Sequence, residues 1–462
     1  MFERVELPVW ALILIVGFAA VTFASHFLFP SVRWFFRKRA ERAVARLNQR
    51  LKRPIEPFKL MRRQDQVIRL VYDPQVMEAV RHYAREEGIP PNVAFEKARS
   101  YAREIVPGFS TATYFGLAIR LARRIGEGLY QVVVRAEDQS ELDHVAPEDA
   151  IVFVMNHRSN MDYVLVTWLA SQHSALSYAV GEWARIWPLK SLIRAMGAYF
   201  IRRRYANPLY RAVLARYVQM SVQQGITQAI FPEGGLSLDG HVGRAKVGLL
   251  TYILRGWDKT GVRDVLFVPV ALAYDRVLED RVLIAAQASG RRRFRGRTGV
   301  ALGFVARILW QKLWGRFRGF GQAAVSYGQP VSLRAFARSH PDHDAEALGD
   351  LLMARIRAAM PILAVPLSAA TLQARGGRGN RSQLEAEASA ILEQLEMAAP
   401  EPARVQEMMA RGLAQLALRG VIVEDSGEFR VSGDAQDLIA YYAASASREP
   451  GPDASPPDRL ST

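Results

Sequence analysis

The sequence predicts a layered α/β domain, preceded by a membrane-spanning helix and a helical unit and followed by a small α+β unit. Three observations support this prediction. Short apolar or β-branched runs alternate with helical stretches in the middle of the chain, apolar residues recur at helical spacing before and after that region, and one uninterrupted apolar segment lies near the start. Strands that alternate with helices are typical of a sheet covered by helices. The 462 residues, 50% of them hydrophobic, suffice for two or three structural units.

The uninterrupted apolar segment is Leu7–Phe29, whose 23 residues include His26 but no Asp, Glu, Lys or Arg. At 1.5 Å per residue a helix of this length is about 35 Å long, enough to cross a bilayer. Trp10 and Trp34 stand near its two ends, where interfacial aromatic residues are common. A cleaved signal peptide fits less well, because the segment is long and the positive charges follow it. We therefore predict a transmembrane anchor over residues 1–32, in preference to a buried soluble helix.

Basic residues outnumber acidic ones, 61 Lys and Arg against 45 Asp and Glu, which gives a net charge of +16 and a pI near 10.2. Nucleic acid, an anionic membrane surface, or an acidic carrier or phosphorylated substrate would each match this charge. Five basic residues follow the apolar segment directly: Arg33, Arg37, Lys38, Arg39 and Arg42. By the positive-inside rule that side is cytoplasmic. We expect a single-pass protein of the cell (inner) membrane whose remaining chain lies in the cytoplasm.

A basic juxtamembrane and helical unit is predicted over residues 33–135. Its first part, up to about residue 60, is expected to lie against anionic head groups. Apolar residues recur at helical spacing from position 77, and a proline pair at positions 90 and 91 separates that stretch from two further helical segments, Ala94–Ile105 and Tyr114–Leu129.

The α/β domain is predicted over residues 136–370. Its expected strands are Ala150–Met155, Tyr199–Ile201, Thr227–Phe231 and Leu266–Ala273, and its expected helices are Tyr163–Ser171, Leu209–Gln224 and Val247–Arg255. Within this domain, basic residues alternate with aromatic ones from Arg291 to Arg318. Such a stretch is typical of an RNA-stacking surface or of a membrane-surface helix, and the helical spacing of Val300–Leu313 favours the membrane.

A C-terminal unit is predicted over residues 371–446. It begins with a Gly/Arg-rich segment, Ala374–Arg381, which we interpret as a linker. Two helical stretches, a hairpin around Asp425–Glu428 and a final helix over Asp437–Ala446 are expected to follow. The tail, residues 447–462, is rich in Pro, Ser and Asp and is expected to be disordered.

The segment AIVFVMNHRSNMDYVLV carries the most specific chemical signal. His157 follows the strand that ends at Met155, and Ser159 or Asn160 can cap the helix that contains Asp162. An Asp that fixes one imidazole nitrogen raises the basicity of the other, which describes a general base aimed at a hydroxyl. The bare spacing is common, and the pair His144 and Asp149 shares it. We interpret that second pair as a solvated surface pair, because it precedes the strand in a loop-like context.

Three further segments are informative in combination. In AMGAYFIRRRYANPLYR a short strand ends in arginines, which suit a phosphate, although a solvated basic turn is the commoner reading of such a run. In ITQAIFPEGGLSLDG a buried strand ends at Glu233, which either binds a substrate hydroxyl or braces the site, and two glycines follow. In VLFVPVALAYD, Pro269 interrupts a buried strand and predicts an edge or a bulge.

In this order the four segments resemble the four blocks of the glycerolipid acyltransferase superfamily, an HxxxxD block, a G-x-x-FI-R block, an F-x-EGG block and a proline-centred apolar strand. The first two, HRSNMDY and GAYFIRR, are most similar to the membrane-bound bacterial and mitochondrial glycerol-3-phosphate acyltransferases. A helical lead-in like Ala98–Arg124 precedes the first block in that subfamily. The resemblance covers residues 95–280 well and is faint in the C-terminal unit, where LIAYYA at Leu438–Ala443 is loosely similar.

The resemblance implies an acyltransferase domain with a mixed sheet flanked by helices. It also implies transfer of an acyl group from acyl-CoA or acyl-ACP to the sn-1 hydroxyl of glycerol 3-phosphate. His157 would be the general base and Asp162 its orienting partner. The residues assigned to substrate binding are Arg158, Ser159, Arg202, Arg203, Glu233, Gly234, Gly235, Ser237 and Lys246. One departure is that Leu236 and Leu238 stand where the subfamily commonly has arginines, so other cations, Arg244 among them, would have to compensate.

The expected partners are glycerol 3-phosphate, the acyl-CoA or acyl carrier protein donor, and an anionic phospholipid membrane, with no nucleic acid. No cofactor or metal is expected beyond the acyl thioester co-substrate. Cysteine is absent, which excludes disulfides and thiolate metal sites. Two alternatives stay open: a 1-acylglycerol-3-phosphate acyltransferase, which shares all four blocks, and a non-catalytic membrane or nucleic-acid binding protein, which the high pI favours.

Overall fold

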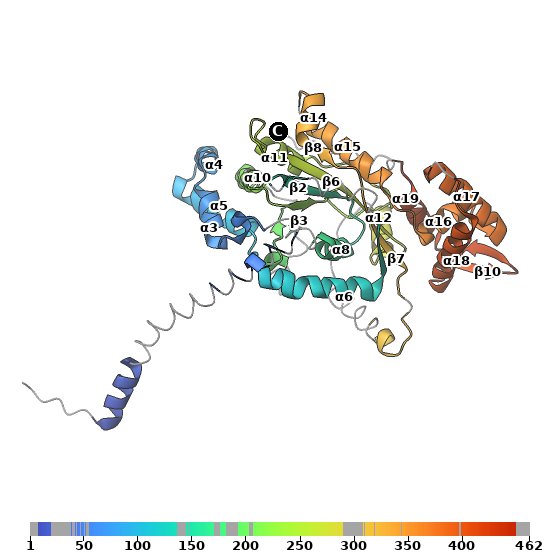
Figure 1. Ribbon diagram of the computed structural model, residues 1–462, viewed down its shortest axis with the longest axis horizontal. Coiled ribbons are helices and arrows are strands. Elements are labelled where there is room, and N and C mark those ends of the chain that lie inside the picture. Colours follow the sequence, from blue (N-terminus) through green and yellow to red (C-terminus); the bar gives the residue numbers. More distant parts are fainter. Residues whose placement is uncertain are drawn as a thin grey trace, which may run out of the picture. The chain divides into compact units, whose positions relative to one another are not determined.

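The computed structural model describes residues 8–19, 38, 42, 44–46, 48, 49, 51, 55–135, 145, 146, 148–170, 176–181, 193–202, 207–289, 308, 310–317, 319–342, 344–396 and 399–449 (Figure 1). The chain divides into two compact units, Met1–Pro54 and Ile55–Thr462.

In the first unit, residues 9–19 are helical. The predicted anchor over Leu7–Phe29 therefore lies only partly within the described residues, and so does the basic segment that follows it. Among the helices that the structure describes, none is long and apolar enough to cross a bilayer. The anchor stays a prediction.

The second unit is built on a mixed sheet. Its main path runs β1-β7-β6-β2-β5-β3-β4, and β8 pairs with β6 beside β7. Strand β6 is antiparallel to β7 and β8, and every other pairing in this sheet is parallel. The predicted mixed sheet flanked by helices is confirmed. The strands are β1 Gln131–Arg135, β2 Ala150–Met155, β3 Ser177–Val180, β4 Tyr199–Phe200, β5 Gln228–Ile230, β6 Val265–Tyr274, β7 Gln322–Tyr327 and β8 Val331–Ser332.

Strand β2 (AIVFVM) is apolar throughout because both of its faces are buried. Ile151, Phe153 and Met155 face one core, the alternate residues face the other, and all six are buried. A strand that is covered on both faces reads as a continuous apolar run rather than as an alternating pattern. The sheet is therefore the middle layer between two sets of helices.

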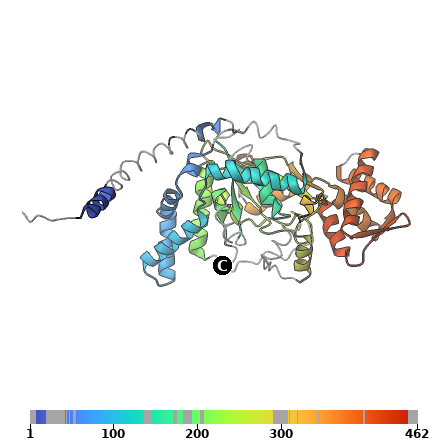
Figure 2. The same cartoon turned by 90° about the horizontal axis from the view of Figure 1, so that it is seen from below.

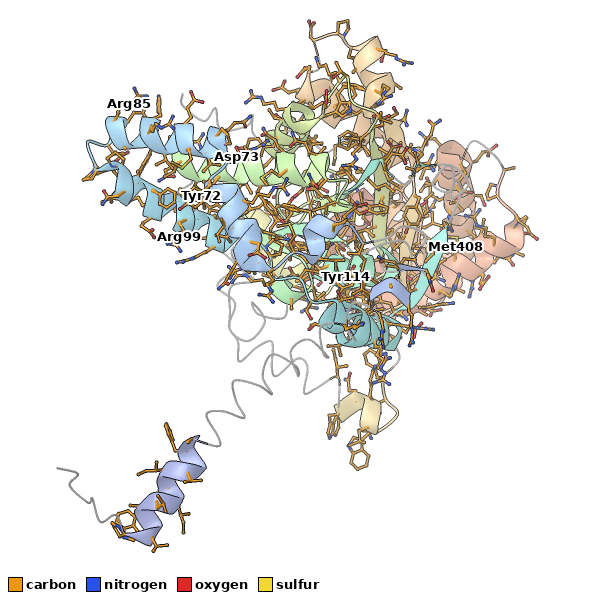
Figure 3. The ribbon with its side chains drawn as sticks, turned by 60° about the vertical axis from the view of Figure 1, so that its left-hand side comes forward. Tyr72, Asp73, Arg85, Arg99, Tyr114 and Met408 are labelled. Carbon is orange, nitrogen blue, oxygen red and sulfur yellow. The ribbon has the colours of Figure 1, made fainter. Side chains whose placement is uncertain are left out.

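The helices that cover one face include three from the predicted helical unit (Figures 1 and 2). This set is α3 Arg63–Val71, α4 Pro74–Glu86, α5 Pro91–Ile105, α10 Pro208–Gln223, α11 Gly248–Gly256 and α15 Ala345–Ala358. Asp73 links two of them, because it accepts a hydrogen bond from the Gln75 amide at the start of α4 and forms a 2.7 Å ion pair with Arg216 of α10 (Figure 3). Short elements complete this part of the chain: α2 Pro57–Leu60, the π-helix Ala112–Ala118 and α14 Leu333–Ser339.

The other face is covered by α8 Met161–Ala170, α12 Asp280–Ser289 and the C-terminal helices. Helix α6 Ile119–Leu129 packs on α8, and Gly126 of α6 lies beside Leu165 of α8. The helix that carries Asp162 is thus held between the sheet and α6.

The C-terminal helices are α16 Ala364–Ala374, α17 Arg381–Glu396, α18 Pro402–Leu418 and α19 Gln436–Ala446, and they gather at one side of the sheet (Figures 1 and 2). A small antiparallel sheet joins β10 Ile422–Asp425, β11 Glu428–Val431 and β9 Arg378–Asn380. The predicted hairpin and final helix are confirmed. The predicted linker at Ala374–Arg381 is wrong, because its paired glycines end α16 in positive-φ conformations and lead straight into β9.

The predicted strands and helices of the central domain all form, within two residues of their expected bounds. The prediction for Pro269 is wrong, since β6 lies inside the sheet and its pairing with β2 is regular through Val154 opposite Pro269. The carbonyl of Pro269 accepts from the Gly328 amide, between β7 and β8. In a strand the nitrogen of a residue points to the same side as its carbonyl, so the Pro269 nitrogen also points to the gap between β7 and β8. Neither strand pairs with β6 at this position, so the missing N–H costs the sheet no hydrogen bond.

Candidate active site

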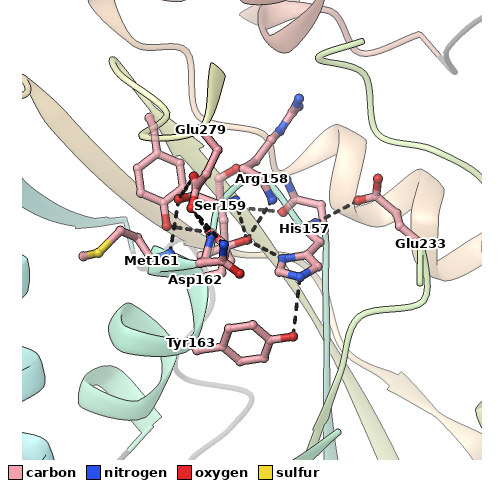
Figure 4. Close-up of polar contacts among 12 residues, drawn as sticks. His157, Arg158, Ser159, Met161, Asp162, Tyr163, Glu233 and Glu279 are labelled. Atoms are coloured by element: carbon pink, nitrogen blue, oxygen red, sulfur yellow. Dashed lines mark hydrogen bonds and ion pairs between the residues drawn. The ribbon is translucent and has the colours of Figure 1, made fainter. Parts of the chain in front are cut away.

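The site forms at the carboxyl ends of three adjacent strands (Figure 4). His157 follows β2, Glu233 follows β5 and Glu279 lies in the turn after β6. Because β5, β2 and β6 are parallel neighbours, the loops after them meet at one edge of the sheet.

His157 and Asp162 form a buried pair. The Nδ1 atom of His157 lies 2.9 Å from Oδ2 of Asp162, and their side chains are 3% and 0% exposed. The same oxygen accepts hydrogen bonds from the backbone amides of Arg158, at 2.7 Å, and Ser159, at 3.0 Å. Tyr274 donates to the other oxygen at 2.6 Å. Since donors converge on the carboxylate from every side, the proton shared with His157 belongs on Nδ1, and Nε2 carries the lone pair.

The Nε2 atom of His157 faces Tyr163. The tyrosine hydroxyl lies 3.5 Å from it, and the ring of Phe231 lies against the imidazole with centroids 4.3 Å apart. The predicted general base therefore has its orienting partner on one nitrogen and a hydroxyl near the other. The predicted geometry of this pair, with the two residues meeting across the turn between β2 and α8, is confirmed.

Glu233 is engaged by backbone amides on both oxygens. It accepts from His157 at 2.9 Å and from Gly243 at 3.3 Å. Burial raises the pKa of this carboxyl, and the nearby charge of Arg158 offsets part of the rise. Of the two roles that the sequence left open, the geometry favours bracing, because Glu233 ties the end of β5 to the backbone of His157.

Arg158 is a buried cation beside this brace. Its Nη1 donates to the carbonyl of Gly240, and the residue is only 2% exposed. Among the described residues, its Nη2 atom has no hydrogen-bond partner. A buried guanidinium nitrogen without a partner is costly, which makes Arg158 a suitable group for an anionic ligand.

Of the two residues predicted to cap α8, Ser159 or Asn160, the hydroxyl of Ser159 bonds the first amide of the helix. This hydroxyl accepts from the Met161 amide at 3.2 Å and donates to Glu279 at 2.7 Å. Glu279 also accepts from the backbone and side-chain amides of Asn160, at 3.3 and 2.9 Å. Burial raises the pKa of Glu279, and these donors oppose the rise. Sequence reasoning missed both Glu279 and Tyr274, and their place at or just after the end of the predicted strand Leu266–Ala273 was the only signal that the sequence offered.

The glycine-block residues shape the loop beside His157. Ser237 donates its amide to the His157 carbonyl at 2.9 Å and its hydroxyl to the His241 carbonyl at 2.8 Å, so it closes the loop on itself. Gly234 has φ of +68°, and a Cβ there would lie 2.8 Å from the Lys246 side chain. The positive φ favours glycine at this position, and the Lys246 side chain lies over the turn.

Arg202 lies apart from this cluster. It follows β4, three strands from β2, which corresponds to about 14 Å at the usual strand spacing. Its guanidinium pairs with both oxygens of Glu104, at 2.9 and 2.6 Å, and lies over the rings of Tyr101 and Tyr210. The predicted partner Arg203 and His144 of the second pair lie outside the described residues. Among those described, no group of three or more His, Asp or Glu residues is placed to hold a metal ion.

Comparisons with known proteins match two family models. One, described as acyltransferase, matches residues 135–273, and the other, the glycerol-3-phosphate acyltransferase C-terminal region, matches residues 310–443. A solved 1-acyl-sn-glycerophosphate (LPA) acyltransferase from Thermotoga maritima is similar with a TM-score of 0.29 and 22% identity, over 50% of this chain and 78% of that one.

Similar curated proteins carry the name glycerol-3-phosphate acyltransferase. The one from Xanthomonas axonopodis pv. citri is 30% identical over 59% of this chain and 30% of its own length, and the one from Pseudomonas entomophila is 29% identical over 58% of this chain and 31% of its own length. The one from Aeromonas hydrophila is 29% identical over 69% of this chain and 41% of its own length. The chain thus spans about a third of the length of these relatives. Both family models and these relatives agree with the geometry of His157 and Asp162, and together they support a relationship to the glycerol-3-phosphate acyltransferases over the matched residues.

Proposed function

We propose that the protein transfers a fatty acyl group from an acyl thioester, acyl-CoA or acyl-ACP, to the sn-1 hydroxyl of glycerol 3-phosphate and so makes lysophosphatidic acid. One observation carries the proposal: the Asp162 carboxylate holds Nδ1 of a buried His157, which leaves Nε2 as a base. The family relationship supplies the acceptor, because the similar curated proteins are named for glycerol 3-phosphate.

The reaction needs one proton transfer and one exchange of bonds. Nε2 of His157 removes the proton of the acceptor hydroxyl as its oxygen attacks the thioester carbonyl. The C–S bond then breaks, and the leaving thiolate takes the proton from the imidazolium. The Tyr163 hydroxyl lies 3.5 Å from the same Nε2 atom. No covalent acyl-enzyme is required, and backbone amides near the glycine turn are suited to the oxyanion.

Binding of the acceptor phosphate is assigned to the basic groups around this loop. A phosphate-binding role for Arg158 is supported by its buried Nη2, which has no hydrogen-bond partner among the described residues. Such a role for Lys246 is supported by the position of its side chain over Gly234. Glu233 and Ser237 support the site by fixing the backbone of His157. A role for Arg202 requires that a substrate phosphate compete with Glu104.

We also propose that the protein works at an anionic membrane, held by the predicted single-pass anchor with its catalytic domain on the cytoplasmic side of the inner membrane. Trp310, Leu313 and Trp314 are 52%, 82% and 64% exposed, and Lys312 and Arg316 stand between and beside them. A Cβ on Gly128 of α6 would lie 2.7 Å from the Lys312 amine, so this segment lies against α6. Exposed Trp and Leu side chains with interspersed cations are typical of a membrane-contacting surface.

The alternative is a 1-acylglycerol-3-phosphate acyltransferase that makes phosphatidic acid. It is favoured by the leucines that follow the glycine block: Leu236 and Leu238 pack in the core and bring no charge to a phosphate.

An acceptor assay separates the two. The full chain in vesicles receives radiolabelled glycerol 3-phosphate or lysophosphatidic acid, each with acyl-CoA and with acyl-ACP. The proposal predicts label from glycerol 3-phosphate in lysophosphatidic acid with at least one donor, and a rate lower by about 10²–10⁴-fold with the His157→Ala variant. Acylation of lysophosphatidic acid alone would establish the alternative instead.

A further inference from the structure

Helix α19 of the C-terminal unit contacts two loops that surround the active site. Helix α19 carries two consecutive tyrosines, Tyr441 and Tyr442, both buried, and each contacts a different loop of the catalytic domain. Tyr442 contacts the turn after β6, and Tyr441 contacts the loop after the glycine block.

The hydroxyl of Tyr442 is fully used. It donates to Oδ2 of Asp280 at 2.7 Å, and it accepts from the Val277 amide at 3.0 Å and from Nη1 of Arg419 at 3.1 Å. A phenol has one proton and two lone pairs, so no capacity remains. Arg419 closes the network through a second bond to Asp280. Burial and the Asp280 charge raise the pKa of Tyr442 well above its usual range, so the hydroxyl keeps its donor proton.

This network holds the turn that orients the catalytic helix. Glu279 lies between Val277 and Asp280, the two residues that Tyr442 fixes, and it binds Ser159 and Asn160 at the start of α8. Asp162 is the second residue of that helix. The path from Tyr442 to the catalytic carboxylate thus runs through hydrogen bonds and one turn of backbone.

Tyr441 makes a different contact. Its backbone carbonyl, rather than its hydroxyl, packs against Gly240, whose own carbonyl accepts from Arg158. Among the described residues, the Tyr441 hydroxyl has no hydrogen-bond partner. Adjacent positions on one helix therefore offer a hydroxyl with three hydrogen-bond partners and a hydroxyl with none among the described residues.

We propose that Tyr442 is a positioning residue for acyl transfer, which makes the C-terminal unit a working part of the active site rather than a separate module. This role rests on the acyltransferase function proposed above. Removing the hydroxyl leaves the buried Val277 amide without its acceptor, so the turn that carries Glu279 becomes more mobile. The start of α8, which Glu279 holds, is then positioned less precisely.

The test compares Tyr442→Phe with Tyr441→Phe in the full chain. Tyr442→Phe should lower kcat about tenfold with the KM for the acyl thioester unchanged, while Tyr441→Phe should match the wild type. Val405→Ala, a buried change in α18 away from the turn, is the control for lost stability and should lower Tm without lowering kcat. Equal kcat values for the two phenylalanine variants, or an equal loss in Val405→Ala, would overturn the proposal.

A second measurement needs no substrate, so it separates this proposal from the proposed function. Amide hydrogen exchange of the resting protein should speed up at residues 277–280 and 158–162 in Tyr442→Phe but not in Tyr441→Phe. A double variant with Glu279→Gln should be no slower than the slower single variant, because both changes act through one turn. Unchanged exchange in both segments, or kcat losses that multiply, would refute the route through Glu279.

Discussion

At the scale of single residues, the sequence was sufficient for the groups that lie close together along the chain. His157, Ser159 and Asp162 were assigned from one segment, and the structure joins them as expected. Tyr274 and Glu279 could not be found in this way, because they reach the segment from 112 and 120 residues further along the chain. Only the pairing of β6 with β2 brings them there.

The Tyr274→Phe variant tests how far the orientation of Asp162 matters. It removes the 2.6 Å donor to one carboxylate oxygen of a side chain that is 0% exposed. Hydrogen bonds to charged groups are worth about 1.5–3 kcal/mol, so we expect a loss of stability in this range and a fall in kcat of about tenfold or more. Denaturant unfolding and steady-state kinetics measure the two effects.

Tyr199→Phe is the matched control for this change. Its hydroxyl is buried and has no hydrogen-bond partner among the described residues, so its removal should leave both quantities near the wild-type values. A Tyr274→Phe enzyme as active as Tyr199→Phe would show that Asp162 does not need this donor.

Arg202 illustrates a limit of residue patterns. Guanidinium groups at a strand end suit a phosphate, but the same letters describe an arginine that pairs with Glu104 of α5. Nothing near position 202 reveals that carboxylate, which lies 98 residues earlier in the chain.

At the scale of elements, the sequence predicted the strands that are buried on both faces. β2 and β6 are continuous apolar runs, β5 (QAI) is a short buried strand with one polar residue, and the bounds of all three were predicted within one residue. β1, β3 and β7 were missed. β3 has four residues, and β7 (QAAVSY) is rich in small side chains, so pairing with neighbouring strands rather than local propensity decides their conformation.

The turn around Gly240 gives a prediction at this scale. Gly240 has φ of +89°, and a Cβ there would lie 2.0 Å from the Tyr441 carbonyl oxygen. Gly240→Ala should therefore separate α19 from the loop that Arg158 holds, with a loss of several kcal/mol in the free energy of unfolding and a large fall in activity.

Gly248→Ala is the control, since that glycine begins α11 with nothing within 4 Å of an added Cβ. Thermal unfolding should show no loss of stability for this change, because alanine is favoured over glycine in a helix. If Gly240→Ala were as stable and active as Gly248→Ala, the contact between α19 and this loop would not matter.

At the scale of the whole molecule, the C-terminal unit contacts the catalytic domain through α16, a helix that spans the boundary predicted at residue 371. Helix α16 begins at Ala364, and its first turn is held by Asp275 at the end of β6: the Val365 amide donates to this carboxylate at 2.9 Å. Burial raises the pKa of Asp275, and the amides that it accepts from oppose the rise. The sequence pattern showed a Gly/Arg-rich break after α16, but the contacts that join the parts come from residues far apart in the chain.

The membrane proposal predicts a loss of lipid binding when Trp310 and Trp314 are changed to Ala. The predicted anchor would hold the full chain on any vesicle, so the test uses residues 55–462, the second compact unit. Its binding to anionic vesicles should weaken in the double Trp variant. Adding Lys312→Gln as a third change should also reduce the salt dependence of binding. Val262→Ala, an 83% exposed apolar side chain outside this surface, is the control and should bind as the wild type does. Vesicle flotation measures the binding of the wild type, the double Trp variant, the triple variant and Val262→Ala. Equal binding by the triple variant and Val262→Ala would contradict a role for this surface.

The central claim is that His157, held by Asp162, is the base of acyl transfer. The most direct measurement is the rate of acyl transfer to glycerol 3-phosphate by the His157→Ala variant in the same vesicles as the wild type. Loss of a general base predicts a fall of about 10²–10⁴-fold with unchanged vesicle binding. Transfer at the wild-type rate by a correctly folded His157→Ala protein would contradict the account.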